Sequence, residues 1–239
     1  PEKDCEWGIF DYSQQEPRIV VHYASMKNFT GADKFVDSYR EDETTDFHKM
    51  VSEIADIPRK KAKTINLGLF YGMGKGKLMS QLGINLEDAT EMLANYNERV
   101  PFVKQLMNDT MNKASKKGYL STIEGRRCRF ELYEPTNEWG QKALPFKEAK
   151  DEYGEHMIKR AFTYKALNRL IQGSAADQTK KAMLELSKEG YLAHIQVHDE
   201  LDFSVATEKD KSRIKEIMEH AVELEVPSKV DVECGDSWG

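Results

Sequence analysis

HIQVHDELDFSV, residues 194–205, has the pattern of a tight β-hairpin with acidic residues at its turn. Apolar residues alternate on both sides, at 195 and 197 and again at 201, 203 and 205, which is typical of strands with one buried face. His198, Asp199 and Glu200 stand between the two runs, where a turn is expected. Asp is common in turns, so a turn-forming role explains Asp199 equally well. A hairpin tip is also a rigid support for a carboxylate that takes part in chemistry.

A second carboxylate, Asp11, stands at the other end of the sequence in a similar setting. Residues 7–10 (WGIF) read as a short buried strand, and residues 12–18 lead from Asp11 into an apolar helix. Pro17 suits the first turn of that helix, where no amide donor is needed. The alternative explanations for Asp11 are an exposed acid at a strand end or a helix cap. The two acids together favour a shared site.

A basic segment, residues 59–77 (RKKAKTINLGLFYGMGKGK), has six cations and no acid. Arg59, Lys63, Leu67 and Tyr71 recur every four residues, so on a helix they form one stripe that is basic at its start and aromatic at its end. The stripe suits a nucleotide, with phosphates at the cations and the base or sugar at the ring. A solvated basic face is the alternative. The glycines match neither the Rossmann nor the P-loop pattern.

The remaining segments predict a mixed fold. Residues 31–58 are expected to be helical, 86–118 a helical pair broken near 100–101, 159–189 a long helix, 208–224 an amphipathic helix and 227–234 a closing strand, whereas 131–155 look irregular. Residues 118–130 predict a hairpin whose Arg126 and Arg127 could contact phosphates, although a merely solvated hairpin is plausible. Asn168 and Gln172 share one face of the long helix. This face could contact DNA, and the alternative is that it packs against another part of the protein.

Composition excludes several classes of protein. Of the 239 residues, 39% are hydrophobic and 32% charged, which suffices for a real core, and no apolar run is long enough to span a membrane. The net charge of −6 argues mildly against a protein coated in nucleic acid. The cysteines, at positions 5, 128 and 234, have no paired spacing, so we expect no disulfide framework, no zinc site and a reducing, cytoplasmic compartment.

Three segments together resemble motifs A, B and C of family A DNA polymerases, the bacterial DNA polymerase I type. They are residues 11–25 (DYSQQEPRIVVHYAS), 59–72 (RKKAKTINLGLFYG) and 196–200 (QVHDE). Residues 46–48, 118–127 and 168–177 are also similar to family segments, in the family's order. The resemblance covers essentially the whole chain, and the replicases of phages look most similar.

The resemblance implies an α+β fold with an antiparallel palm sheet, its helices and an inserted, mostly helical fingers subdomain. The implied limits are 1–30 for the first part of the palm, 31–160 for the fingers and 161–239 for the second part of the palm. The implied activity is template-directed DNA synthesis, in which a dNTP is joined to the 3′-hydroxyl of a primer by a two-metal-ion mechanism. Primer-template DNA and dNTP are the implied partners, in a bacterial or phage-infected cell.

The resemblance also assigns roles to residues. Asp11 and Asp199 would bind two Mg²⁺ ions together with the backbone carbonyl of Tyr12, Glu200 would support that site, and Lys63 would donate a proton to the leaving group. The residues implied to bind the nucleotide are His48, Arg59, Lys63, Leu67, Tyr71 and Glu16, the last as a gate against a ribose 2′-hydroxyl. The residues implied to contact DNA are Arg18, Asn168, Gln172, His198, Arg126 and Arg127.

Some features depart from the family pattern. Leu67 stands where the family has Phe or Tyr, and Tyr164 replaces an Arg, with Lys165 beside it. The family's thumb, the first part of its palm and its exonuclease have no counterpart, and the sequence begins with Pro1. We therefore expect a fragment or a split subunit that needs an N-terminal thumb segment for full activity.

Two alternatives differ in class. A single-subunit RNA polymerase shares the two Asp residues, but Glu16 and QVHDE argue against it. A polymerase remnant that binds DNA or a partner without chemistry has no need to keep clustered charges such as Asp11, Asp199, Arg59 and Lys63.

Overall fold

The fold is taken from a computed structural model that describes residues 1–137 and 140–238. The chain divides into two compact units: the first comprises Pro1–Met50 and Ser174–Gly239, and the second comprises Val51–Gly173. Helices and antiparallel sheets make up both units, so the expected α+β fold is confirmed. The palm and fingers limits at residues 31 and 160 stay predictions.

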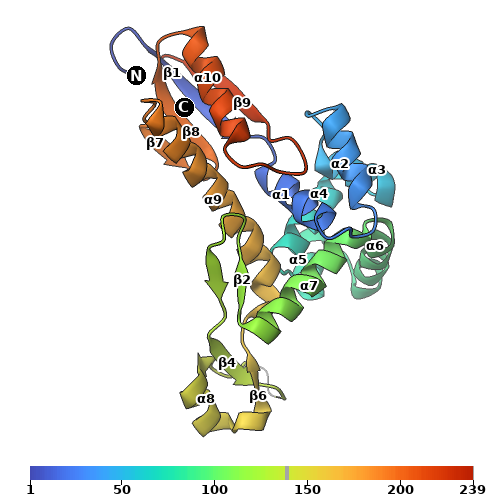
Figure 1. The fold of residues 1–239 in the computed structure, drawn as a ribbon. Coiled ribbons are helices and arrows are strands. Elements are labelled where there is room, and N and C mark those ends of the chain that lie inside the picture. Colours follow the sequence, from blue (N-terminus) through green and yellow to red (C-terminus); the bar gives the residue numbers. More distant parts are fainter. Residues whose placement is uncertain (138–139, 239) are drawn as a thin grey trace. The chain divides into compact units, whose positions relative to one another are not determined.

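The first unit is built on an antiparallel sheet with the strand order β7-β8-β1-β9. Its strands are β1 (Glu6–Tyr12), β7 (Ile195–Val197), β8 (Glu200–Val205) and β9 (Val230–Gly235). Its helices are α1 (Gln15–Ser25), α2 (Ala32–Glu41), α10 (Glu208–His220), the start of α3 (Phe47–Ala55) and the second part of α9 (Ala166–Lys188). Figure 1 shows α10 lying along the sheet.

Alternation along the strands gives this sheet two different faces. Phe10, Leu201 and Phe203 point to one face and form a core with Ala182 of α9 and Ile214 of α10. The Tyr12 hydroxyl donates to the Met218 carbonyl at 2.6 Å and so ties β1 to α10. The alternation thus leaves the other face to Asp11 and Glu200, as the sequence pattern predicts.

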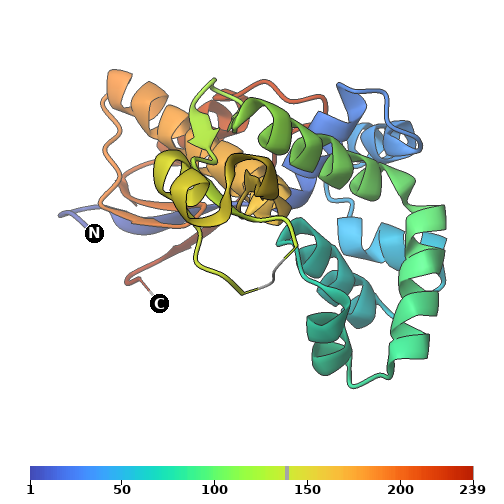
Figure 2. The same ribbon diagram turned by 90° about the horizontal axis from the view of Figure 1, so that it is seen from below.

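The second unit is mostly helical. Its elements are α4 (Arg59–Phe70), α5 (Lys75–Leu82), α6 (Leu86–Arg99), α7 (Pro101–Lys117), β2 (Tyr119–Ser121), β3 (Arg127–Arg129), β4 (Leu132–Pro135), β5 (Leu144–Pro145), α8 (Phe146–Tyr153), β6 (Ile158–Arg160), the 3₁₀ turns η1 (Glu155–Met157) and η2 (Thr163–Lys165), and the start of α9. The predicted break near residue 100 is confirmed: Val100 leaves helical geometry, and α6 and α7 meet there at a bend (Figure 2).

The expectation that residues 131–155 are irregular was wrong. These residues contribute β4, β5 and α8 to a small sheet in the order β5-β4-β6, which α8 contacts. Tyr133 of β4 meets Phe146 of α8 edge-on, with ring centroids 5.0 Å apart. The predicted helix over 159–189 also begins later, at Ala166, because β6 and η2 precede it.

Within the described part of the chain, no helix has both the length and the apolar character needed to cross a bilayer. Across the same residues Cys5, Cys128 and Cys234 form no disulfide.

Candidate active site

Asp11 and Asp199, from opposite ends of the sequence, come together at one end of the sheet in the first unit. Antiparallel pairing of β1 with β8 sets Asp11 opposite Glu200, the residue after Asp199. The Tyr12 amide donates to the Asp199 carbonyl at 3.4 Å. The hairpin predicted around Asp199 is confirmed: Val197 pairs with Glu200, and His198 and Asp199 form the turn. His198 has φ 55°, a left-handed conformation that closes this short turn.

Negative charge is concentrated at this end of the sheet. The pKa of Asp11 is raised to about 6, chiefly by burial and then by the charges of Asp199, Glu200, Asp231 and Glu233. Burial also raises the pKa of Asp199, and Glu200 adds to the effect, while a backbone hydrogen bond and His198 oppose it. The ionised carboxylates are therefore destabilised in this setting, and a cation bound beside them would stabilise their charged form.

The donor set fits Mg²⁺ but does not enclose it. Among residues 1–137 and 140–238, no group of three or more His, Cys, Asp or Glu side chains is placed to hold a metal. Asp11 and Asp199 offer two carboxylates, beside the backbone of Tyr12. Mg²⁺ is usually bound by one or two carboxylates together with water and substrate phosphates, and not by a cage of protein ligands.

The turn after β1 fixes the start of α1 and of α3. Gln14 has φ 53°, and its side chain donates to the Thr45 carbonyl at 2.9 Å and accepts from the Phe47 amide at 2.8 Å. His48 therefore lies on an element tied to the turn that follows Asp11, although its side chain is only 7% exposed. Glu16, in the first turn of α1, is half-buried.

Arg18 differs from the DNA contact that we expected. Its side chain is 2% exposed and lies against the Tyr39 ring, 4.5 Å from the centroid. The guanidinium donates to the backbone carbonyls of Ser13, Pro227 and Glu43, at 2.8, 2.5 and 2.5 Å. With its donors used inside the unit, Arg18 holds three loops together and has no surface left for DNA.

The predicted stripe on α4, in the second unit, faces solvent. Arg59 and Lys63 are exposed, Leu67 is half-buried and Tyr71, just after the helix, is 43% exposed. The opposite face is buried, and there the Tyr96 hydroxyl of α6 donates to the Asn66 side chain at 2.6 Å. The same helix thus has one face packed in the core and one face exposed to solvent.

The predicted hairpin, β2 with β3, is attached to the start of α9 in the second unit. Arg126 donates to the Gly173 carbonyl at 2.8 Å, and Arg169 of α9 donates to the Arg129 carbonyl at 2.9 Å. A side chain at Gly173 would lie 2.8 Å from Thr122, so only glycine permits this approach. Arg127 is exposed and lies over the Tyr119 ring, 4.7 Å from the centroid.

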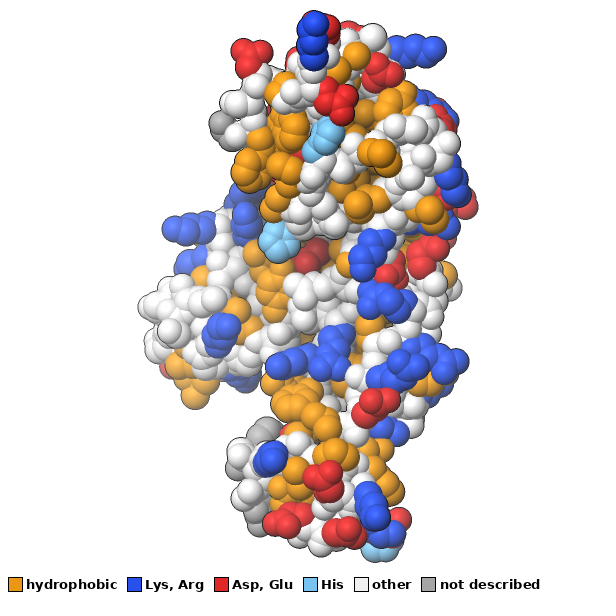
Figure 3. Space-filling view, turned by 90° about the vertical axis from the view of Figure 1, so that its left-hand side faces the viewer, with side chains coloured by type: hydrophobic (Ala, Val, Ile, Leu, Met, Phe, Trp, Pro, Cys, Tyr) orange, Lys and Arg blue, Asp and Glu red, His pale blue; other side chains and the backbone are white. Residues whose placement is uncertain are grey.

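Asn168 and Gln172 follow on the exposed side of α9, half-buried and exposed respectively. The structure thus gathers Arg126, Arg127, Asn168 and Gln172 on one pair of elements. Figure 3 shows Lys and Arg side chains gathered at the height of β2 and β3, above the small sheet β5-β4-β6.

Three features near the site have no signal in the sequence. Asp202 of β8 is completely buried, Glu200 accepts a 3.4 Å hydrogen bond from the Trp238 indole, and Gln15 donates to the Ala175 carbonyl at 3.3 Å. Each depends on partners far away in the sequence, which the alternation of apolar residues does not identify.

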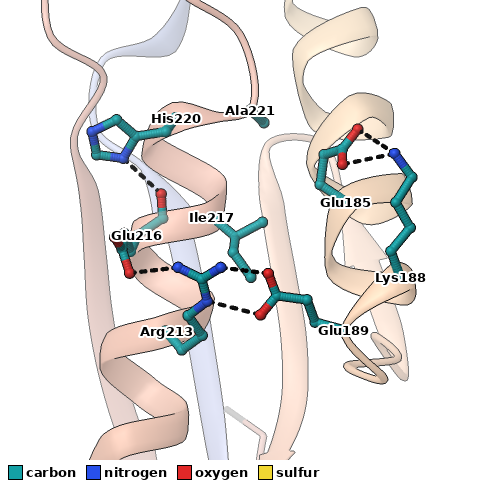
Figure 4. Close-up of a pocket in the computed structure, with 8 residues that line it drawn as sticks. All are labelled: Glu185, Lys188, Glu189, Arg213, Glu216, Ile217, His220 and Ala221. Atoms are coloured by element: carbon teal, nitrogen blue, oxygen red, sulfur yellow. Dashed lines mark hydrogen bonds and ion pairs between the residues drawn. The ribbon is translucent and has the colours of Figure 1, made fainter.

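A surface groove between α9 and α10 has a described lining that includes none of the predicted site residues (Figure 4). Arg213 pairs with Glu189 and Glu216, and Lys188 pairs with Glu185. These charges satisfy one another, and we assign the groove no role in the site. Its described lining consists of Glu185, Lys188, Glu189, Arg213, Glu216, Ile217, His220 and Ala221.

Comparisons with known proteins agree on one family. The model of DNA polymerase family A matches residues 1–239. A DNA-directed DNA polymerase of Pseudomonas phage M6 is 38% identical over 100% of this chain and 39% of its own length. DNA polymerase I of Bacillus subtilis (strain 168) is 34% identical over 99% of this chain and 26% of its own length.

A solved structure agrees as well. The polymerase domain of Pol1 from M. smegmatis, in complex with DNA primer-template and dNTP, matches 100% of this chain and 41% of that chain, with a TM-score of 0.77 and 30% identity. This chain thus spans roughly a quarter to two fifths of the length of these relatives. Since the family model covers the chain from end to end, the protein belongs to DNA polymerase family A.

Proposed function

We propose that this chain carries the catalytic centre of a template-directed DNA polymerase, which joins a dNTP to the 3′-hydroxyl of a primer. The observation that carries the proposal is the convergence of Asp11 and Asp199 in a strongly acidic setting at one end of a sheet. The M. smegmatis relative, whose structure holds primer-template DNA and dNTP, supports the choice of substrates.

We propose that Asp11, Asp199 and the Tyr12 carbonyl hold two Mg²⁺ ions. When bound, such ions activate the attacking hydroxyl and neutralise charge on the phosphates. Glu200 keeps the Asp199 hairpin in register with β1 through its pairing with Asp11.

The exposed stripe of α4 suits the triphosphate. Arg59 and Lys63 carry positive charge at the N-terminal half, and Lys63 can give a proton to the departing pyrophosphate. Leu67 and Tyr71 offer apolar and aromatic surface to the sugar and base. His48 and Glu16 stay candidates for a further phosphate contact and for the gate against ribonucleotides.

DNA would lie against the second unit's hairpin and the start of α9, through Arg126, Arg127, Asn168 and Gln172. His198 is exposed in the Asp199 turn and stays a candidate for the primer end. Arg18 is withdrawn from this set, because its guanidinium is buried. A segment corresponding to the rest of the relatives' length is a further proposed partner.

Primer extension tests the proposal directly. Asp199→Asn keeps the shape of the turn and removes the charge, so extension should fall by at least about 100-fold. Asp33→Asn, an exposed acid on α2, is the matched control and should retain activity. Unchanged extension in Asp199→Asn would refute the mechanism, and preference for NTP over dNTP would favour the RNA polymerase alternative. DNA binding without any extension, also after addition of a thumb segment, would favour the non-catalytic remnant.

A further inference from the structure

Tyr164 is an aromatic residue whose ring is on the surface. It lies in η2 and is 48% exposed, whereas half of the aromatic side chains in the described chain are buried in the core. The residue two positions earlier, Phe162, has φ 59°, a conformation that is costly for a residue with a side chain. An exposed ring presented by a strained backbone suggests a use outside the core.

Tyr164 also touches the end of the proposed nucleotide helix. Gly72 follows Tyr71 with φ 69°, and a Cβ there would lie 2.6 Å from the Tyr164 carbonyl oxygen and 3.5 Å from its ring. Glycine at position 72 therefore serves both the turn and this close approach. Two exposed rings, Tyr71 and Tyr164, thus belong to one small area of the second unit.

The residues that follow Tyr164 along the chain extend this area into two parallel rows of side chains. Tyr164, Asn168 and Gln172 recur every four residues, and so share one side of η2 and α9. Lys165 and Arg169 form a second row beside them. The Lys165 ammonium lies 5.6 Å from the Tyr164 ring centroid, and Arg169 lies over Phe130, 4.7 Å from its centroid.

A row of ring and amide groups beside a row of cations matches the chemistry of a nucleic-acid strand. Aromatic rings stack on unpaired bases, amides hydrogen-bond to base or sugar edges, and cations attract phosphates. Paired bases inside a duplex do not expose their faces to such a ring. The ligand that uses both rows is therefore a strand with at least one unpaired base.

We propose that Tyr164 is a stacking platform for an unpaired base of the template strand and that Lys165 binds the adjoining phosphate. The assignment of the strand as the template rests on the proposed function. The stacking and phosphate contacts themselves do not depend on it. The platform adds a base-binding position next to Tyr71, in a place where the sequence departs from the family pattern.

Binding of labelled single-stranded DNA at several salt concentrations tests the proposal. The intact oligonucleotide is compared with versions that carry one abasic residue at successive positions. Removing the base at one position should weaken binding to the natural chain by about tenfold. Tyr164→Phe should keep that difference, and Tyr164→Leu should abolish it without changing the salt dependence.

Lys165→Met should give the complementary result, with the base effect kept and the slope of log K against log salt reduced by about 0.7. Phe146→Leu is the matched control, because Phe146 is 47% exposed on α8 of the same unit and should have no effect on either quantity. Thermal melting by circular dichroism identifies any variant that fails to fold, and Tyr164→Gln then replaces Tyr164→Leu as the variant that should lose the base effect.

A base effect that persists in Tyr164→Leu would overturn the platform, as would the absence of single-strand binding by the natural chain. Loss of primer extension with the base effect intact would count against the proposed function and leave the platform standing. The two proposals can thus fail separately.

Discussion

Asp202 shows how a single residue can make the free energy of unfolding depend on pH. Its side chain is completely buried in β8, and its pKa is raised to about 6, first by burial and then by the charge of Glu200 and a hydrogen bond with the Glu200 side chain. When both groups are ionised neither can donate, so the carboxylate of Asp202 has no hydrogen-bond partner. The alternation of apolar residues in β8 predicts a polar residue at 202, but it does not show that the residue is covered.

Asp202→Asn should stabilise the chain at neutral pH and not at acid pH. The folded-state pKa lies above the ordinary value of 3.8, so the cost of ionising Asp202 is absent below about pH 4 and complete above about pH 6. The substitution should add about 1–3 kcal/mol to the free energy of unfolding at about pH 7.5, and little at about pH 4. Urea unfolding at both pH values measures this, with Asp33→Asn as the exposed control. An equal increase in the free energy of unfolding at both pH values would show that ionisation of Asp202 is not the cause.

The helix α4 shows what one element contributes. Its inner face is held by the buried hydrogen bond between Tyr96 and Asn66, and its outer face presents Arg59 and Lys63 to solvent. Lys63→Ala should raise the apparent KM for dNTP by about tenfold, because a charge-assisted hydrogen bond to phosphate is lost. Affinity for primer-template DNA should stay nearly the same.

Lys60→Ala is the matched control on the same helix, since Lys60 is exposed but lies off the stripe. Steady-state extension kinetics and DNA titrations measure the two constants. If both substitutions raised the apparent KM equally, or if Lys63→Ala weakened DNA binding as much as dNTP binding, the cations of α4 would have only a general electrostatic role.

Elements in which residues of one kind recur at a regular spacing could be predicted from the sequence, and elements without such a spacing could not. The Asp199 hairpin and α4 follow from alternation and from the four-residue stripe. The sheet β5-β4-β6 could not be predicted, because its strands are very short and β5 consists of Leu144 and Pro145. Arg18 was misassigned for another reason: its sequence position does not show that the carbonyls of Pro227 and Glu43 take its donors.

At the scale of the whole molecule, the residues proposed for catalysis and for nucleotide binding are divided between the two units. Asp11, Asp199 and His48 lie in the first unit, and Arg59, Lys63, Tyr71 and Asn168 lie in the second. The unit limits fall inside α3 and α9, so the chain passes from one unit to the other through continuous helices. Both segments that join the units are therefore helical, and residues proposed for one reaction come from both.

Duplex DNA should bind this chain more weakly than it binds a full-length relative. The chain matches 39% of the length of the Pseudomonas phage M6 polymerase, and we propose that the unmatched part of such a protein adds phosphate contacts. Each lost contact should reduce the slope of log K against log salt by about 0.9. Titrations of one primer-template with both proteins, over a range of salt concentrations, give the two slopes. Equal affinities and slopes would mean that the matched region alone makes the duplex contacts, and the proposed need for a thumb segment would then be wrong.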